Sequence, residues 1–484
     1  MKITVQIVID AQDGTPPAVE QVAAIARDDL TMASAGLALA EAHEVLSGIQ
    51  HHLVTAQAAA AAVAGQPCGS CGQARARKDT RYIVLRTLFG TLRLDSPRYK
   101  ACPCVGAGPA TVSPVAALLP ERTTPELLLW EAKYAALISY GAAATLLSET
   151  FPLGRTLYAT AVRQQVESTA ARLEDELGEE RASFIDTCPA DWEEMPRPGL
   201  PLVIALDGGY VHSSRQTSRK DGWFEAVTGT STPAGGGPAK AFAWVQTYDD
   251  KPKRRLYELL RSQGMQDNQQ VVFFTDGGED IRDIPRYLNP QAEHYLDWFH
   301  ITMRLTVLRQ MTRSLPAPDA RQDHDDDAPW IPDPGQADRD LERVKHLLWH
   351  GNTFRAMQIL EDLRDDFEIA CAAAGADNKQ RAFFERLAEF CTYIGRNSEE
   401  IPNYGERHRC GEPISTATAE ATVNQVISRR MVKKQQMRWS PRGAHLLLQV
   451  RTRVLNDDLT ADFARWYPGF GDSAQQPDVV NDAA

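Results

Sequence analysis

Two aspartates with the same local sequence are the first candidates for chemistry in this chain of 484 residues. Asp207 ends the apolar run of PLVIALDGGYV, and Asp276 ends that of QVVFFTDGG. Each apolar run predicts a buried strand, and each Gly-Gly pair predicts a turn. A carboxylate at the carboxyl end of a buried strand is held rigidly while its side chain faces a cleft. Asp-Gly is also an ordinary turn dipeptide, but its recurrence after two such strands favours a site.

A third carboxylate is expected from Glu420, near the start of a predicted helix that Ser415 or Thr416 caps. Glu406 and Glu412 lie nearby in the sequence and are the alternatives. We favour Glu420 because it lies on the predicted helix and a basic stretch follows it.

Three clustered carboxylates repel one another unless cations lie between them. Two Mg²⁺ ions, about 4 Å apart, would neutralise this charge, activate the attacking oxygen and stabilise the leaving oxygen in phosphoryl transfer. Mg²⁺ prefers one or two carboxylates together with phosphate oxygens, and Mn²⁺ accepts the same ligands. Asp207, Asp276 and Glu420 therefore predict a two-metal site.

A basic stretch follows Glu420. From Ala421 to Asn456 the sequence has eight Lys or Arg and no acidic residue. The net charge of −12 for the whole chain argues against nucleic acid, but this local excess lies beside the predicted site. We expect the stretch to follow a DNA backbone. The candidate contacts are Arg429, Arg430, Lys433, Lys434, Arg438 and Arg442.

Four of the eight cysteines have the spacing of a metal site. Cys68-x-x-Cys71 and Cys102-x-Cys104 flank a predicted hairpin with strands at 82–88 and 91–98 and a turn at Phe89-Gly90. Four thiolates held by a hairpin form a tetrahedral zinc site of the ribbon type, although the second spacer is one residue shorter than usual. The remaining cysteines are expected to be buried free thiols: Cys188, Cys371, Cys391 and Cys410.

The segment between the first and last of the four clustered cysteines is basic. Eight Lys or Arg against two Asp give it a charge of +6. Such a ribbon is typical of proteins that contact phosphates. The alternative is a structural knob, stapled by zinc, whose basic face is only solvated.

A further strand is predicted at 294–298, after the one that leads to Asp276, and Asp297 and His300 lie at its end. Two hypotheses fit this Asp-x-x-His pair. It positions DNA, or a flipped base, near the cleavage site; or it makes a structural hydrogen bond that fixes the strand against the helices that follow.

The elements that carry these residues predict an α/β fold. Between residues 199 and 300 the order is three strands, a helix, a strand, a helix and a strand, which is the order of an RNase H-like sheet. This catalytic core continues at 406–470 after a helical insertion at 301–405, which contains an aspartate-rich loop. The other predicted parts are an N-terminal strand and helical region (1–66), the zinc-ribbon-like DNA-binding hairpin (67–106), a helical DNA-binding or connecting domain (107–198) and a disordered tail (471–484).

Composition is that of a globular protein, with 43% hydrophobic and 24% charged residues. No apolar run reaches the 18 residues or so of a membrane span, and the N-terminus lacks the pattern of a signal peptide. We therefore expect a cytoplasmic protein with no membrane partner.

Several longer segments resemble one known family. LDGGYV, TDGGEDIR, LDWFHITMRLTVL, LLWHGN and the block IPNYGERHRCGEPISTATAEATVNQVISRRMVKKQQMRWSPRGAHLLLQVRTRVLN are similar to the Kra-type family of bacterial insertion-sequence transposases. The resemblance extends from about Cys68 to Phe470. The Asp297-Trp-Phe-His300 segment also resembles the Asp-x-x-His signature of Mutator-like transposases with helical insertions.

The resemblance implies a DDE transposase that works in the bacterial nucleoid. Asp207, Asp276 and Glu420 match its acidic triad, which would cut transposon ends with Mg²⁺ and join the freed 3′-hydroxyl to target DNA. Expected partners are transposon-end and target double-stranded DNA, with a homodimer or larger oligomer in the synaptic complex. An RNase H-like nuclease without strand transfer is one alternative. A domesticated protein that only binds DNA is another.

Overall fold

The protein was examined as a computed structural model. It describes residues 1–484 except for 11–15, 106–108, 182, 185–187, 197–198, 216–221, 279–282, 290, 317–330, 373–376, 416–420, 433–436 and 472–484. Helices and strands are both abundant, which agrees with the predicted α/β class. Of the helices in the described part of the chain, none is long and apolar enough to span a membrane.

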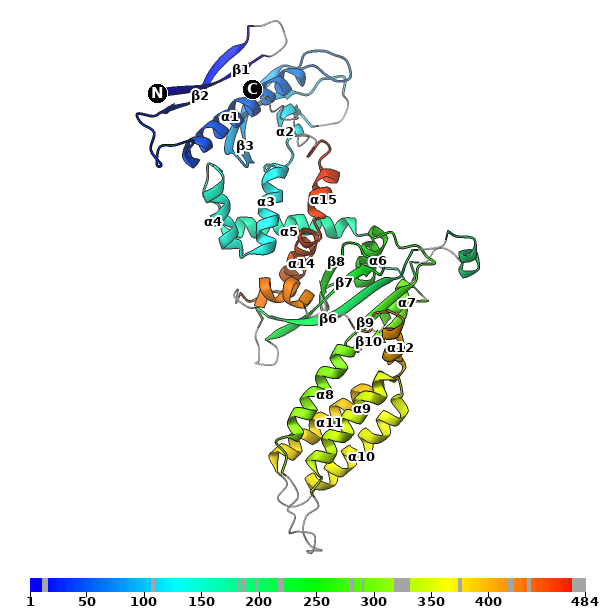
Figure 1. Cartoon of the computed structure of the whole chain (residues 1–484). Coiled ribbons are helices and arrows are strands. Elements are labelled where there is room, and N and C mark those ends of the chain that lie inside the picture. Colours follow the sequence, from blue (N-terminus) through cyan, green and yellow to red (C-terminus); the bar gives the residue numbers. More distant parts are fainter. Residues whose placement is uncertain are drawn as a thin grey trace, which may run out of the picture. The chain divides into compact units, whose positions relative to one another are not determined.

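The chain forms two compact units (Figure 1). The first combines Met1–Arg172 with Asp457–Ala484, and the second is Leu173–Asn456. These boundaries differ from the predicted ones, because the residues after 456 belong with the N-terminal part rather than with the predicted core.

The first unit begins with an antiparallel hairpin of β1 (Lys2–Ile9) and β2 (Ala18–Ala26). A helix was predicted from residue 17 onward, and this is wrong for β2. The alanine-rich sequence AVEQVAAIA suits a helix, but its backbone pairs with β1 instead. Helix α1 begins only at Leu39 (Leu39–Ala64), where Glu41 in its first turn pairs with Arg27, just beyond β2.

A three-stranded antiparallel sheet follows, made of β3 (Arg77–Thr87), β4 (Gly90–Lys100) and β5 (Thr111–Val112). The predicted hairpin is confirmed, but its strands are longer and its turn is Leu88-Phe89. Alternate residues such as Ile83 and Leu94 are buried against Ala62 of α1, whereas Tyr82 is exposed. The period of two thus gives the hairpin one apolar face and one open basic face.

The rest of the first unit is helical, as predicted. Its helices are α2 (Pro114–Leu118), α3 (Pro125–Leu137), α4 (Tyr140–Thr150), α5 (Ala159–Glu176) and α15 (Leu459–Trp466). Helix α5 runs across the boundary and its last residues belong to the second unit.

A five-stranded mixed sheet is the centre of the second unit. Its strands have the order β10-β9-β6-β7-β8, in which β6, β7 and β8 are antiparallel and β6, β9 and β10 are parallel. The predicted succession of strands and helices is confirmed. The bounds are β6 (Leu202–His212), β7 (Trp223–Pro233), β8 (Lys240–Val245), α6 (Pro252–Ser262), β9 (Val271–Thr275), α7 (Asp283–Leu288) and β10 (Glu293–Leu296).

Helices cover both faces of this sheet. On one face, Leu202, Ile204 and Leu206 of β6 pack with residues of α6 and α7. On the other, η4 (Asn424–Val432) lies against β6, and α14 (Pro441–Leu455) lies against β8. Gln449 of α14 donates to the carbonyl of Ala243, 3.0 Å away, which fixes α14 to the edge strand.

The predicted helical insertion is four long helices: α8 (Trp298–Thr312), α9 (Pro334–Trp349), α10 (Thr353–Ala372) and α11 (Asn378–Arg396). They share a core that includes Leu305, Leu341, Phe367 and Phe383. The aspartate-rich loop was predicted at 315–340, and residues 317–330 of it lie outside the described residues. The predicted loop is too long, because α9 begins at Pro334 with Asp333 as its N-cap. Among the described residues, three short helices also belong to this unit: η1 (Pro189–Glu193), η3 (Ser398–Glu400) and α12 (Tyr404–Arg409).

The four scattered cysteines are free, but they do not share the predicted burial. Cys391 is buried among the insertion helices, and Cys371 is partly buried. Cys188 and Cys410 are exposed, so the prediction is wrong for them. A cysteine outside a motif carries little information about its environment, because its burial depends on distant elements.

Candidate functional site

Asp207, Asp276 and Asp297 lie in one row across three neighbouring parallel strands. Asp276 and Asp297 directly follow β9 and β10, whereas Asp207 lies within β6, so the Gly-Gly turn predicted after Asp207 is wrong. The amide of Asp297 donates to the carbonyl of Thr275, 2.9 Å away, which continues the pairing of β10 with β9. In the strand registers, Ala205 lies opposite Phe274 and Leu296 lies opposite Thr275. Continued along the strands, these registers place Asp207 level with Asp276, and Asp276 level with Asp297.

The charges that act on the Asp207 carboxylate show which side chains lie near it. Burial raises the pKa of Asp207, and the carboxylates of Asp276 and Asp297 add to that rise. His300 opposes it, together with the amide of Gly208, which donates to the Asp207 carboxylate. Asp276, Asp297 and His300 therefore lie within electrostatic reach of Asp207. The structure thus brings Asp207 and Asp276 together as the sequence predicts, and adds Asp297 to them.

The turn after Asp276 explains the Asp-Gly-Gly sequence. The Asp276 carboxylate accepts the amide of Gly278 at 3.0 Å. Gly277 has a φ of +84°, a backbone angle that residues with a Cβ rarely adopt. A Cβ at Gly277 would lie 2.8 Å from the side-chain amide of Asn397, at the end of α11. Glycine is needed here both for the backbone angle and for the close approach of the insertion.

Asp297 is the N-cap of α8 rather than the end of a strand. Its carboxylate accepts the amide of Phe299 at 2.8 Å and the hydroxyl of Ser415 at 2.6 Å, and the residue is 2% exposed. The predicted strand at 294–298 is therefore too long, since the chain turns into a helix at Trp298. Asp297 makes the structural hydrogen bond of the second hypothesis. His300 lies in the first turn of α8 and is only partly buried.

The insertion contributes three side chains that sequence reasoning did not identify. Arg304 follows His300 by one turn of α8, and its guanidinium lies 4.2 Å from the ring centre of Tyr393 on α11. Burial raises the pKa of Tyr393, and the charges of Asp276 and Asp297 also act on it. With Asn397, these residues border the aspartate row. The i, i+4 spacing of His300 and Arg304 was the available signal.

Glu420 lies outside the described residues, as do Lys433 and Lys434. The residues that follow Glu420, 421–432, are described. A Cβ at Gly209 would lie 3.1 Å from Val423 and 2.8 Å from Ile427. Asp207 and Gly209 are two residues apart on β6 and so face the same side of the sheet. The helical segment that follows Glu420 thus packs on the face toward which Asp207 points.

The predicted basic surface is correct for some of its residues and wrong for others. Arg429, Arg438 and Arg442 are exposed. Arg430 is 1% exposed, and its guanidinium lies 5.2 Å from the ring centre of Trp439. Arg430 is therefore packed in the interior and is not part of a surface that faces DNA. Arg451 is also buried, and it donates to the carbonyl of Val426 at 2.8 Å.

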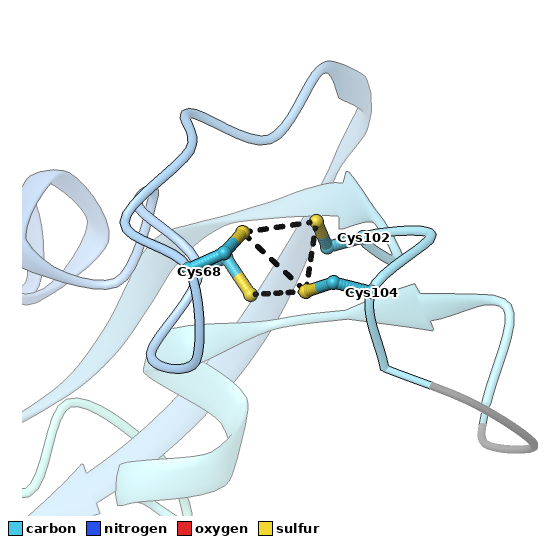
Figure 2. Close-up of side chains that lie close together, drawn as sticks. Cys68, Cys102 and Cys104 are labelled. Atoms are coloured by element: carbon cyan, nitrogen blue, oxygen red, sulfur yellow. Dashed lines mark hydrogen bonds between the residues drawn. The ribbon is translucent and has the colours of Figure 1, made fainter.

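The four cysteines of the hairpin form a compact cluster (Figure 2). The sulfur of Cys104 lies 3.3 Å from that of Cys102, 3.4 Å from that of Cys71 and 3.5 Å from that of Cys68. Tetrahedral zinc with Zn–S bonds of about 2.3 Å places its sulfurs about 3.8 Å apart, so the four residues can hold zinc. The short Cys-Pro-Cys spacer does not prevent either of its cysteines from joining the cluster.

The first knuckle is built to hold a thiolate. The amides of Cys71 and Ser70 donate to the sulfur of Cys68 and lower the pKa of this thiol to about 6. The loop closes because the amide of Gly72 donates to the carbonyl of Cys68 at 2.7 Å. Gly72 has a φ of +73°, so glycine suits the residue that ends the knuckle.

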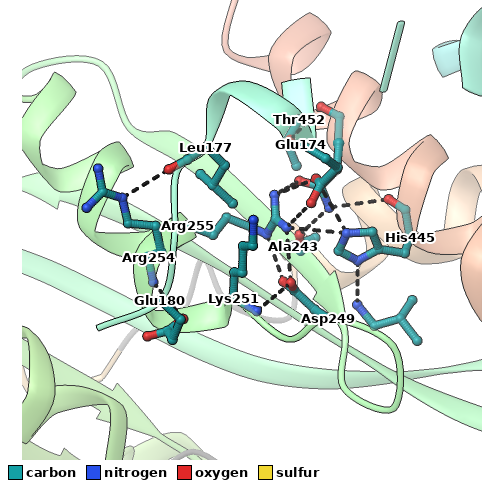
Figure 3. A network of polar contacts seen from close by, with 12 residues as sticks. Glu174, Leu177, Glu180, Ala243, Asp249, Lys251, Arg254, Arg255, His445 and Thr452 are labelled. Atoms are coloured by element: carbon teal, nitrogen blue, oxygen red, sulfur yellow. Dashed lines mark hydrogen bonds and ion pairs between the residues drawn. The ribbon is translucent and has the colours of Figure 1, made fainter. Parts of the chain in front are cut away.

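A second polar cluster in the second unit was not expected from the sequence (Figure 3). Arg255 of α6 pairs with Glu174 at 2.8 Å and with Asp249 at 2.9 Å. The ring of His445 lies 3.5 Å from the Glu174 carboxylate and accepts from the amide of Val245. Glu174, Asp249 and His445 have a metal-like spacing, but the guanidinium already supplies positive charge among them. We read this cluster as a structural ion network.

No protein-family model and no curated protein matches the chain.

Proposed function

We propose that this chain is a DDE transposase with an RNase H-like core, which cuts DNA and transfers strands with bound Mg²⁺. The observation that carries the proposal is the row of Asp207, Asp276 and Asp297 across three adjacent parallel strands. The strand order, with three antiparallel strands followed by two parallel ones, supports the RNase H-like assignment.

Asp207 and Asp276 would supply oxygen ligands to Mg²⁺, and Glu420 would complete the site from the helix that leads to Val423. The raised pKa of Asp207 supports this reading, because a cluster of carboxylates in a partly buried place needs cations to stay ionised. The metal ions would activate the attacking oxygen and stabilise the leaving one. Asp297 would act through the position of α8, since Phe299 and Ser415 already bond to it.

The site has a cationic border that suits a phosphate. Arg304 is exposed beside Tyr393, and His300 lies near Asp207. A scissile phosphate held between the metal ions and these groups would have its negative charge compensated on two sides.

DNA binding would use the hairpin of the first unit. Its open face carries Arg93, whose guanidinium lies 3.7 Å from the ring centre of the exposed Tyr82. Arg77, Lys78 and Arg81 are also exposed. These exposed cations of the hairpin meet the charge requirement of a phosphate contact, and zinc would keep the hairpin in shape.

The decisive experiment is an excision assay with purified protein, Mg²⁺ and a DNA carrying the transposon ends. Asp207→Ala, Asp276→Ala and Glu420→Gln should each lower the cleavage rate by about a thousandfold or more, since each would remove metal-bound charge stabilisation. Asp250→Asn, an exposed carboxylate of the same unit, is the control and should leave the rate unchanged. Wild-type cleavage by any of the first three variants would remove that residue from the triad.

Strand transfer is tested separately with ends that are already cut. Joining of these ends to a target plasmid distinguishes a transposase from a nuclease of the same fold. A protein that binds DNA but neither cuts nor joins it with Mg²⁺ or Mn²⁺ would be a domesticated DNA-binding protein, and the proposal would fail.

A further inference from the structure

A cavity of about 320 Å³ in the first unit is separate from every site described above. Four segments line it: the end of β3, the residues before α3, the middle of α5 and the end of α15. We call it the arginine cleft. Its charged and aromatic lining is Arg86, Glu121, Arg122, Arg172, Trp466 and Tyr467.

Positive charge is in excess in this cleft. Three guanidiniums face one carboxylate, Glu121, in a chain whose net charge is −12. Glu121 is engaged on two sides, because Arg172 pairs with it at 3.8 Å and the hydroxyl of Tyr467 donates to it. Arg122 donates to the carbonyl of Leu119, which orients its guanidinium. Arg86 also acts on the buried carboxylate of Glu131, which pairs with Arg155. The arginines around the cleft still outnumber these two carboxylates, so an excess of positive charge remains to attract an anion from solution.

Flat surfaces lie beside this charge. The guanidinium of Arg172 is 4.6 Å from the ring centre of Trp466 and 5.2 Å from that of Tyr467. The ring of Phe463 packs near the indole of Trp466, with ring centres 5.2 Å apart. The rings of Trp466 and Tyr467 are partly exposed. Indole and guanidinium planes of this kind are the surfaces on which nucleic-acid bases stack.

Size and lining together select the ligand. The volume is near the lower end of the range for small-molecule sites, roughly 300–1,000 Å³. We propose that the arginine cleft binds one nucleotide, with the phosphate on Arg86 and Arg122 and the base against Trp466. The nucleotide is either free or part of a single DNA strand. No residue of the aspartate row takes part, so this inference stands apart from the proposed function.

Calorimetric titration of the full chain with deoxyadenosine monophosphate, at low salt and without added divalent metal, tests the proposal. The double variant Arg86→Gln/Arg122→Gln should bind at least about tenfold more weakly, since two charge-assisted hydrogen bonds are lost. Arg163→Gln is the matched control, because Arg163 is an exposed arginine of α5 outside the cleft. Equal binding by the wild type and the double variant would overturn the proposal.

The place of the base is tested with Trp466→Leu and with inorganic phosphate as a second ligand. We expect Trp466→Leu to weaken binding of the nucleotide and to leave binding of phosphate unchanged, whereas Trp466→Phe should keep most of the nucleotide affinity. If phosphate binds as tightly as the nucleotide, the assignment of the base is wrong. Thermal melting of every variant identifies those that fail to fold.

A single-stranded oligonucleotide in a third titration separates the two sources. Binding of the strand that depends on Arg86 and Arg122, without binding of the free nucleotide, assigns the cleft to DNA. Binding of the free nucleotide in the same way assigns it to a small molecule. If neither the oligonucleotide nor the free nucleotide shows binding that depends on Arg86 and Arg122, the proposal is wrong.

Discussion

Arg304 is an exposed cation on α8, one turn after His300. We predict that Arg304→Met lowers the cleavage rate by about ten- to a hundredfold, because a guanidinium that meets a phosphate contributes roughly 1.5–3 kcal/mol. The melting temperature should change little, since the side chain is exposed. Arg313→Met, at the exposed end of the same helix, is the control. Equal rates for the two variants would contradict a role for Arg304 in the reaction.

The turn after Asp276 gives a second prediction for a single residue. Gly277→Ala should lower the free energy of unfolding by about 1–3 kcal/mol, because the backbone angle is unfavourable and the new Cβ would press on Asn397. Gly411→Ala separates these causes: its φ is +73°, but no atom lies within 4 Å of a Cβ there. Denaturant unfolding measures both variants. If both variants lose the same free energy of unfolding, the contact with Asn397 does not contribute to the loss at Gly277.

Among elements, the ion network joins the end of α5 to α6 and α14. Burial raises the pKa of Glu174, but hydrogen bonds from His445 and Arg255 more than offset this and bring it to about 2. A carboxyl whose folded pKa is depressed stabilises the protein above its unfolded pKa, about 4.5, and loses that contribution as the pH falls toward 2.

We therefore predict that Glu174→Gln costs on the order of 3 kcal/mol of stability at pH 7 and progressively less between pH 5 and pH 2. The measurement is denaturant unfolding of the wild type and the variant over this range. Asp175→Asn, at an exposed carboxylate on the same helix, is the control. A difference between wild type and Glu174→Gln that stays constant with pH would exclude the ion pairs as its source.

The elements also show what sequence patterns can and cannot predict. The apolar runs before Asp207 and Asp276 predicted two central strands, and their parallel pairing gathers the carboxylates as expected. β2 was missed because alanine suits a helix in isolation and only the partner strand β1 decides otherwise. Arg255 and Glu174 were missed because residues far apart in the sequence leave no local signal. Arg430 was assigned to the surface because its charge, and not its packing on Trp439, is visible in the sequence.

At the scale of the whole molecule, two units with separate cores should unfold separately. The first unit contains the four-cysteine cluster, and the second contains the Arg255 network. Calorimetry of the zinc-loaded protein should therefore show two transitions.

Each transition can be assigned by a perturbation specific to one unit. Chelation of zinc should lower the transition of the first unit by about 10 °C or more, because the four cysteines lose the ion that would join them and its binding free energy no longer stabilises the hairpin. Arg255→Met should lower only the transition of the second unit, since it leaves two carboxylates without their partner. Cys188→Ser, an exposed thiol outside the cluster, should change neither. If chelation and Arg255→Met each shift both transitions by the same amount, the two units unfold as one cooperative body and the division of the chain fails.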